Sequence, residues 1–234
     1  MKKACQIEPV IGCGVYTVPD VSKILGFSKD RIRRWVSGYK RTGKGKKYEY
    51  KPMIDEGFWG EGASRAVNFY SLVEMYTFIK LLDLGISVRN IRKAREELKA
   101  RFDLPYPFAS HKLLCDGHQI VIEMQSIDNK IYLLLGEGGQ TAFQEAIKLY
   151  YKKIDFNDSS TLAERYWPAG KDRMVVVDPN RGFGRPTIRN TNITTEVIFS
   201  LYQAGEDKMQ IADLYEVDEK AIEDAVGFEL CKAA

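Results

Sequence analysis

The sequence has few of the residues and patterns on which many enzymes and membrane proteins depend. Its 234 residues include only two histidines. Because no catalytic pair occurs at a characteristic spacing either, we expect a chain that is not an enzyme. No apolar run of about 18 residues occurs, and the basic start at Met1 is not followed by an apolar core. We therefore expect neither a membrane-spanning helix nor a signal peptide, and we expect a cytoplasmic protein.

Cysteine is also rare, and its four positions form no CxxC pair: Cys5, Cys13, Cys115 and Cys231. Scattered cysteines are typical of reduced thiols and not of a disulfide framework. His111, Cys115 and His118 are donors that zinc accepts, but Asp116 or Cys231 would have to supply a fourth ligand. We therefore expect no metal and no cofactor.

A helix-turn-helix pattern begins at Tyr16. Thr17 can cap a first helix whose apolar face contains Val21 and Ile24, and Pro19 suits its first turn. Gly26 can adopt the left-handed conformation that ends a helix. Ser28 can then accept the free amides of a second helix, so the two helices are expected to meet at a steep angle.

The second helix has a basic outer face that continues into a basic strip. Ile32, Trp35 and Val36 repeat at helical spacing, so the arginines between them point outward. Residues 29–51 carry ten basic and two acidic side chains, a net charge of +8, whereas the whole chain is only +3. A basic helix is often just a solvated face. Here it coincides with a helix-turn-helix and with a flexible strip at residues 42–47 suited to phosphates, which favours contact with duplex DNA.

A pair of helices is predicted next. Ser71 and Glu74 form a possible capping box for the first helix, and Ser87 begins the second. Pro105 ends the pair, and the apolar period then changes to that of strands. We predict strands at 119–124, 131–135, 151–156 and 162–167, and a helix at 142–150.

The tail from Met174 is a separate unit of opposite charge. A strand at 175–177 leads into a glycine- and proline-rich turn at 178–186, which lacks P-loop spacing and favours a hairpin or bulge. Three helices follow, with Val197, Leu214 and their neighbours predicted on apolar faces, and Asp207 with Gln210 is expected to cap the second of them. Residues 206–229 hold nine acidic and two basic side chains, a net charge of −7, which would repel phosphate. A basic protein surface is a reasonable partner, and a merely soluble acidic tail is the alternative.

Two family resemblances follow from these motifs. The first half resembles MerR-type regulators in the segments Tyr16 to Ser28, Ile32-Arg33-Arg34-Trp35, Phe69 to Glu74 and Leu84-Gly85-Ile86-Ser87. The tail is similar to a domain long labelled as of unknown function and found in type II antitoxins of the VapB class, in the motifs Val177-Asp178-Pro179, Gly184 to Ile193, Ala204-Gly205-Glu206 and Ile211 to Tyr215. The tail departs from that family at Asn190, where glycine is more usual, which bears on the shape of that turn.

The resemblances imply an α+β fold that is mainly α, in three parts. Residues 1–107 would be a MerR-like winged helix-turn-helix with a helical hairpin. Residues 108–173 would be a small β-rich connecting region, and residues 174–234 an acidic, helix-turn-helix-like module of three helices. The implied function is that of an antitoxin that neutralises a PIN-type ribonuclease toxin and represses its own operon, usually as a homodimer. The alternative is a MerR-like regulator whose region 111–175 binds a small effector, with no toxin partner. A nuclease using Glu123, Asp128 and Asp178 is a third, weaker possibility.

The residues expected to act follow from this interpretation. The predicted contacts to double-stranded operator DNA are Ser28, Lys29, Arg31, Arg33, Arg34, Tyr39, Lys40, Arg41, Lys44, Lys46 and Lys47, with the last three on phosphates. The predicted contacts to the toxin are Arg181, Arg185, Arg189, Glu219, Glu223 and Asp224. The acidic residues would meet a basic rim of the nuclease, whereas the arginines could reach carboxylates at its active site.

Overall fold

The computed structural model describes residues 14–43, 46–60, 64–110 and 152–233. Over these residues the fold mixes α and β, with seven α-helices, several small sheets and nearly half of the residues helical. The chain forms two compact units, one of residues 1–69 with 165–234 and the other of residues 70–164. The mixture of helices and short strands agrees with the predicted α+β class, whereas the division at residues 107 and 173 stays a prediction. No helix in the described part is long and apolar enough to cross a membrane.

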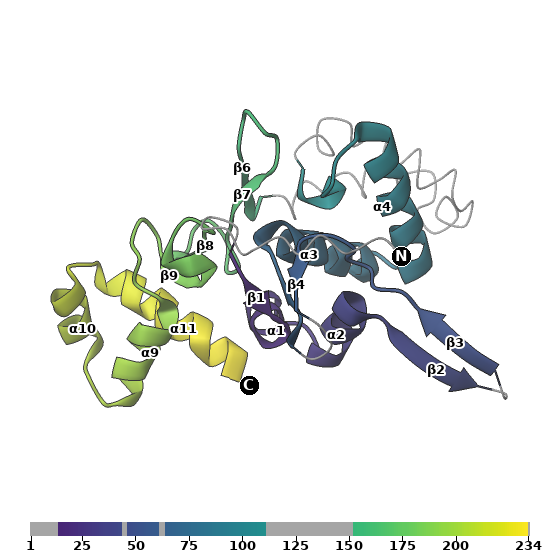
Figure 1. The fold of residues 1–234 in the computed structure, drawn as a ribbon. Helices are drawn as coiled ribbons and strands as arrows, with labels where there is room; N and C mark the ends of the chain where they lie inside the picture. The colour runs from purple at the N-terminus through teal and green to yellow at the C-terminus, as the bar shows by residue number, and fades with distance from the viewer. Residues whose placement is uncertain (1–13, 44–45, 61–63, 111–151, 234) are drawn as a thin grey trace. The chain divides into compact units, whose positions relative to one another are not determined.

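Two short helices open the first unit, and their ends confirm most of the local signals (Figure 1). Helix α1 (Val18–Leu25) begins at Thr17, whose hydroxyl accepts the amide of Asp20 at 3.4 Å, while the Asp20 carboxylate accepts the amide of Thr17 at 2.9 Å. Gly26 ends α1 at φ 62°, in the left-handed region that suits glycine. Helix α2 (Lys29–Ser37) follows Ser28, but the Ser28 side chain makes no capping hydrogen bond, so that expectation was wrong.

An antiparallel hairpin stands where a flexible strip was expected. Strand β2 (Tyr39–Gly43) pairs with β3 (Lys46–Tyr50) in a register that places Tyr39 opposite Tyr50 and Gly43 opposite Lys46. The Tyr39 and Tyr50 rings stack with their centres 4.4 Å apart, and such cross-strand aromatic pairs fix the register. Figure 1 shows the hairpin extending away from α1 and α2. A separate small sheet has the order β1-β5-β4, with β1 at Tyr16–Thr17, β4 at Phe58–Trp59 and β5 at Ala66–Val67.

The described part of the second unit contains two long helices, α3 (Phe69–Asp83) and α4 (Val88–Phe102). The Ser87 hydroxyl accepts the amide of Asn90 at 3.3 Å and begins α4, as predicted. The predicted capping box at Ser71 and Glu74 was wrong, because α3 begins at Phe69 and both side chains are fully buried. Glu74 instead forms a buried ion pair with Arg95 of α4 at 2.8 Å.

Short elements follow α4 in the described part of the chain. A 3₁₀ turn (Pro107–Ala109) follows α4, and its Phe108 ring packs edge-on against Phe78 of α3. Strands β6 (Ile154–Phe156) and β7 (Ala163–Tyr166) confirm the two strands predicted here. The predicted strands at 119–124 and 131–135, the helix at 142–150 and the His111, Cys115 and His118 group lie outside the described residues.

The C-terminal segment belongs to the first unit and confirms the predicted hairpin. Strand β8 (Val175–Val177) pairs antiparallel with β9 (Pro186–Ile188), and a 3₁₀ turn (Gly182–Gly184) lies between them. Asn190 adopts φ 63°, the conformation that glycine would take, which asparagine tolerates better than most residues. The departure from the family motif therefore keeps a left-handed turn at this position.

Three helices follow the hairpin: α9 (Thr195–Gln203), α10 (Lys208–Tyr215) and α11 (Glu219–Ala233). Asp207 caps α10 by accepting the amide of Met209 at 2.9 Å, as predicted. The helices and the hairpin share a core that includes Val175, Ile188, Ile198, Ile211 and Ile222. Val197 and Leu214, predicted on apolar faces turned to the core, are instead 44% and 69% exposed.

Candidate nucleic-acid interface and C-terminal charged surface

The outer face of α2 carries the predicted arginines in exposed positions. Ile32, Trp35 and Val36 are buried, so helical geometry turns the remaining positions toward solvent. Ser28, Lys29, Arg31, Arg33 and Arg34 are exposed. All five of these predicted contact residues are therefore accessible to solvent.

Local contacts hold these arginines without covering them. Arg33 forms an ion pair with Asp30 on the same helix at 2.9 Å, and its side chain is still 57% exposed. The Arg31 guanidinium lies 5.5 Å from the centre of the Phe27 ring, and that of Arg34 lies 5.6 Å from the centre of the Tyr39 ring. Such cation–π contacts orient a guanidinium while leaving its hydrogen-bond donors available.

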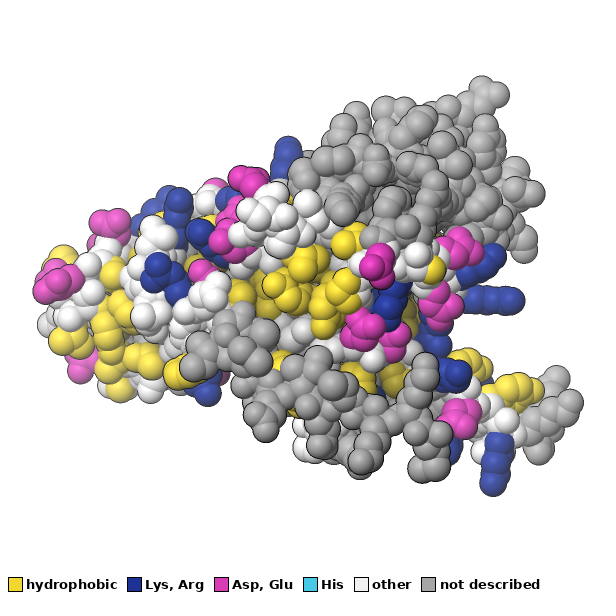
Figure 2. All heavy atoms as spheres, turned by 45° about the horizontal axis from the view of Figure 1, so that its top comes forward, with side chains coloured by type: hydrophobic (Ala, Val, Ile, Leu, Met, Phe, Trp, Pro, Cys, Tyr) yellow, Lys and Arg dark blue, Asp and Glu magenta, His cyan; other side chains and the backbone are white. Residues whose placement is uncertain are grey.

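The hairpin extends the basic surface beyond α2. Lys40 is 79% exposed and lies 3.5 Å from Glu49 on the paired strand. Arg41 and Lys47 are exposed, and within the described residues no acidic group lies in ion-pair range of either. Figure 2 shows basic and apolar side chains exposed along this hairpin. Lys44 lies outside the described residues, and only the backbone of Lys46 is described.

The arginines predicted to contact a toxin surround the β8–β9 hairpin. Arg181 lies 3.8 Å from the buried Asp178 carboxylate and donates to the carbonyl of Asn190 at 3.3 Å. Arg185 is 65% exposed and lies 3.6 Å from Glu196. Arg189 is exposed and stacks on the Trp167 ring at 5.5 Å. All three cations therefore lie on chain segments that border the β8–β9 hairpin.

The predicted acidic contacts on α11 divide into two groups. Glu219 and Glu223 are exposed, and Glu223 lies 3.9 Å from Lys208. Asp224 differs from the expectation, because it is only 7% exposed. Its carboxylate accepts Arg173 at 2.8 Å and the amide of Met174 at 2.9 Å, so it holds the chain before β8 against α11. This carboxylate also raises the pKa of Arg173.

Of the acidic residues named in the third, weaker hypothesis, only Asp178 lies in the described part of the chain. Asp178 is buried and lies 3.7 Å from Arg165 and 3.8 Å from Arg181, which neutralise it. Glu123 and Asp128 lie outside the described residues. No cluster of three potential metal ligands occurs in the described part of the chain.

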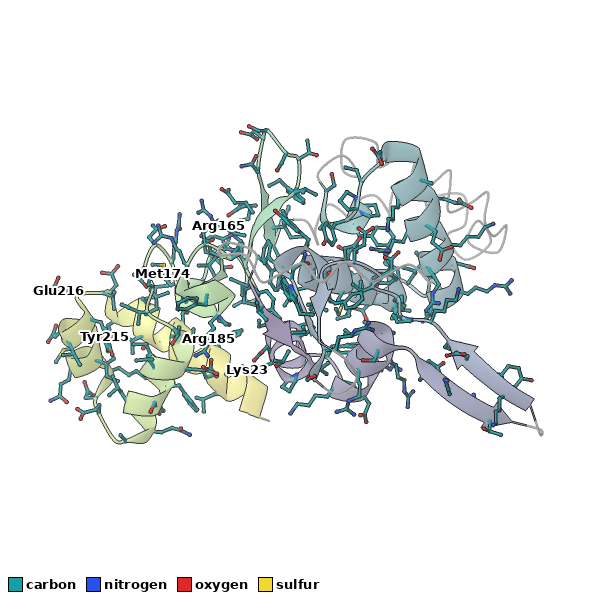
Figure 3. All side chains as sticks on the ribbon, viewed as in Figure 1. Lys23, Arg165, Met174, Arg185, Tyr215 and Glu216 are labelled. Carbon is teal, nitrogen blue, oxygen red and sulfur yellow. The ribbon has the colours of Figure 1, made fainter. Side chains whose placement is uncertain are left out.

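A contact that sequence reasoning missed joins the first helix to the last. Lys23 of α1 pairs with Glu229 of α11 at 2.7 Å and with Glu196 of α9 at 3.2 Å. The Glu229 carboxylate, only 5% exposed, also accepts the Thr195 hydroxyl at 2.6 Å. Figure 3 shows Lys23 beside the C-terminal helices, with Arg185 near it. No local pattern marks Lys23, because its partners lie more than 170 positions away in the sequence.

The chain is similar in sequence to one described protein family and to two mycobacterial proteins. Residues 175–228 match the family described as "Protein of unknown function (DUF433)". The chain is 24% identical over 221 residues to "Putative antitoxin VapB45" of Mycobacterium tuberculosis, which covers 91% of this chain and 92% of that protein. It is 23% identical over 246 residues to "Uncharacterized protein Rv2308" of the same organism, covering 97% and 95% of the two chains.

A solved structure shares the fold. The crystal structure of Rv2018 from Mycobacterium tuberculosis aligns with a TM-score of 0.68 at 22% sequence identity, over 90% of this chain and 96% of that one. The chain is therefore similar along nearly its whole length to mycobacterial proteins, one of which carries an antitoxin name.

Proposed function

We propose that this chain is the antitoxin of a type II toxin–antitoxin system, which binds and neutralises a PIN-type ribonuclease and represses its own operon. The similarity to VapB45 over nine-tenths of both chains supports the antitoxin role. The exposed basic surface of α2 and the β2–β3 hairpin supports the DNA-binding role, and this surface is the observation that carries the proposal.

The proposed mode of DNA binding is that of a winged helix-turn-helix. Helix α2 would enter the major groove, where Arg31, Arg33 and Arg34 can reach phosphates or guanine edges. The hairpin would act as the wing, with Arg41 and Lys47 on the phosphate backbone. One such helix buries too little surface to hold an operator tightly, so we propose that two copies bind a palindrome as a homodimer.

The DNA-binding proposal is tested by the salt dependence of binding to the duplex upstream of the protein's own gene. Removing one cation that neutralises a phosphate should reduce the slope of log K against log salt by about 0.9. Because both copies of the homodimer lose two contacts, Arg41→Gln with Lys47→Gln should flatten the slope by roughly 3.6. Lys220→Gln, at an exposed lysine on the acidic helix α11, is the matched control and should leave it unchanged. An unchanged slope in the hairpin variant would remove the hairpin from the interface.

The antitoxin proposal is tested by co-expression with the adjacent open reading frame. We expect a stable complex with a ribonuclease whose activity is suppressed in the complex and recovered on release. If no nuclease co-purifies, the antitoxin role is refuted, and a regulator without a toxin becomes the better interpretation.

A further inference from the structure

Phe183 is the most exposed of the large hydrophobic side chains in the described residues, at 88%. It also adopts a left-handed backbone conformation, with φ 57° and ψ 29°. This conformation is unfavourable for any residue with a Cβ atom, and glycine would adopt it without strain. Phenylalanine therefore does not stabilise the fold at this position, because its side chain is not buried and its backbone conformation is unfavourable. A strained and solvent-exposed aromatic residue is better explained by an intermolecular role.

The segment that carries Phe183, residues 181–185, is held firmly at its base. We call it the Phe183 loop. It connects β8 to β9 where Val177 pairs with Pro186. The amide of Gly184 donates to the Arg181 carbonyl at 2.8 Å, and the amide of Arg181 donates to the Asp178 carbonyl at 3.0 Å. These bonds fix the backbone on both sides of the exposed ring.

Close packing on either side of Phe183 keeps its ring turned outward. Gly182 and Gly184 both have positive φ values, 52° and 81°. A Cβ atom at Gly182 would lie 2.6 Å from the Thr187 methyl, and one at Gly184 would lie 2.5 Å from the Tyr16 hydroxyl. The Phe183 loop is therefore pressed against β9 and the N-terminal strand, so binding would require little further ordering.

Charge around the loop selects the kind of partner. Arg185 is 65% exposed and Arg181 is 42% exposed, so two cations flank the ring. A nucleic acid is the alternative partner, because an aromatic side chain flanked by arginines can also contact bases and phosphates. However, Glu196 lies beside Arg185, and the helices that follow carry a net charge of −7, which repels a phosphate polymer. This charge repels the continuous row of phosphates of a nucleic acid more strongly than it repels a few isolated carboxylates. The surroundings therefore favour a protein surface whose carboxylates lie only where the two arginines can reach them.

We propose that the Phe183 loop is a docking element that inserts the Phe183 ring into an apolar pocket of a partner protein whose rim carries carboxylates. This inference rests on the proposed function, in which the partner is the ribonuclease toxin. Aromatic residues at the centre of a small contact commonly dominate the affinity of such interfaces. The flanking arginines would then guide association and fix the orientation of the ring.

The proposal is tested with Phe183→Gly in the full chain, measured against the protein encoded by the adjacent open reading frame. Glycine suits the backbone at this position, so thermal stability should not fall. The dissociation constant should rise about 30-fold or more, as for the loss of an aromatic hot spot. Phe183→Tyr retains the ring and should stay within about 3-fold of wild type. Leu214→Ala, at another highly exposed apolar residue, is the matched control and should also stay within about 3-fold.

Each other outcome has a clear meaning. If Phe183→Gly binds the partner like wild type, the docking role is overturned, while the complex itself still supports the proposed function. If Phe183→Gly weakens operator binding and leaves the protein complex intact, the loop contacts nucleic acid and the inference is again overturned. If wild type forms no complex, the proposed function and this inference both fail.

Discussion

Replacement of Lys23 by methionine should destabilise the first unit, because it removes the cation from a contact with a buried carboxylate. Methionine preserves most of the side-chain length, so the change is mainly electrostatic. The Glu229 carboxylate is 5% exposed and lies 2.7 Å from the Lys23 ammonium; among the described residues it would retain only the Thr195 hydroxyl as a donor. The lysine side chain itself is 31% exposed.

The size of the effect follows from these exposures. Breaking a fully buried ion pair costs about 3–5 kcal/mol, whereas exposed pairs contribute about 0–1 kcal/mol. Because the Lys23 side chain is partly solvated, water screens the pair, and we expect a loss of about 2 kcal/mol in the free energy of unfolding. For a unit of this size, this corresponds to a fall in melting temperature of roughly 4–8 °C.

Urea denaturation of wild type and Lys23→Met, followed by circular dichroism, measures the difference. Lys80→Met is the matched control, because the Lys80 side chain is 30% exposed and pairs at 3.0 Å with Asp83, which is 52% exposed. The control should lose about 0.5 kcal/mol or less. If Lys23→Met costs no more than Lys80→Met, the contact between α1 and α11 contributes little and the electrostatic argument fails.

The pH dependence gives an independent check. Burial alone would lower the pKa of Lys23, but its bonds to Glu229 and Glu196 outweigh burial and hold the pKa above the usual 10.5. A raised lysine pKa in the folded state stabilises the fold fully below the pKa of the unfolded state. The advantage of wild type over Lys23→Met should therefore be constant from neutral pH to pH 10, and should shrink as the pH rises through the folded pKa. If raising the pH from 7 to 9 already removed the stability advantage of wild type over Lys23→Met, this account would be wrong.

Three further predictions concern buried and exposed acids. Asp224→Asn should lower the free energy of unfolding in urea by about 1–3 kcal/mol, because a buried acceptor of two hydrogen bonds loses its charge. Glu223→Gln, on the exposed side of the same helix, is the control and should change the free energy of unfolding by less than about 0.5 kcal/mol. Arg95→Met should destabilise the second unit by about 3–5 kcal/mol. Glu74→Gln made together with it should recover part of the loss in the same assay, because glutamine is uncharged and can still accept the buried Phe108 amide. Glu219→Lys combined with Glu223→Lys should weaken the toxin complex in a binding titration; a complex indifferent to both changes would favour the arginines around the β8–β9 hairpin as the toxin contacts.

Much of the local structure could be predicted from the sequence, because helix ends depend on residues within one turn. Thr17, Gly26, Ser87 and Asp207 each mark a helix boundary that the structure has at that place. The exposed arginines of α2 were also predictable, since a helix with three buried residues at regular spacing must turn the others outward.

Two of the errors share a physical cause, which is pairing between residues far apart in the sequence. Glu74 looked like a capping residue, but its partner Arg95 lies on the next helix. Asp224 looked like surface charge, but Arg173 and the Met174 amide hold it against the chain before β8. Spacing in the sequence says nothing about either pair. The exposed Phe183 carried a weak signal, since an apolar residue between two glycines at a turn is seldom needed for a core.

The contact between α1 and α11 also has a consequence for biosynthesis. Residues 14–69 leave the ribosome long before residues 165–233, with which they form one compact unit. At elongation rates of about 5–20 residues per second this interval is on the order of ten seconds. During this time Tyr16 lacks the Phe183 loop and Lys23 lacks the C-terminal helices. A nascent or prematurely terminated chain therefore exposes its N-terminal half to proteases, and only a nearly complete polypeptide can close the unit.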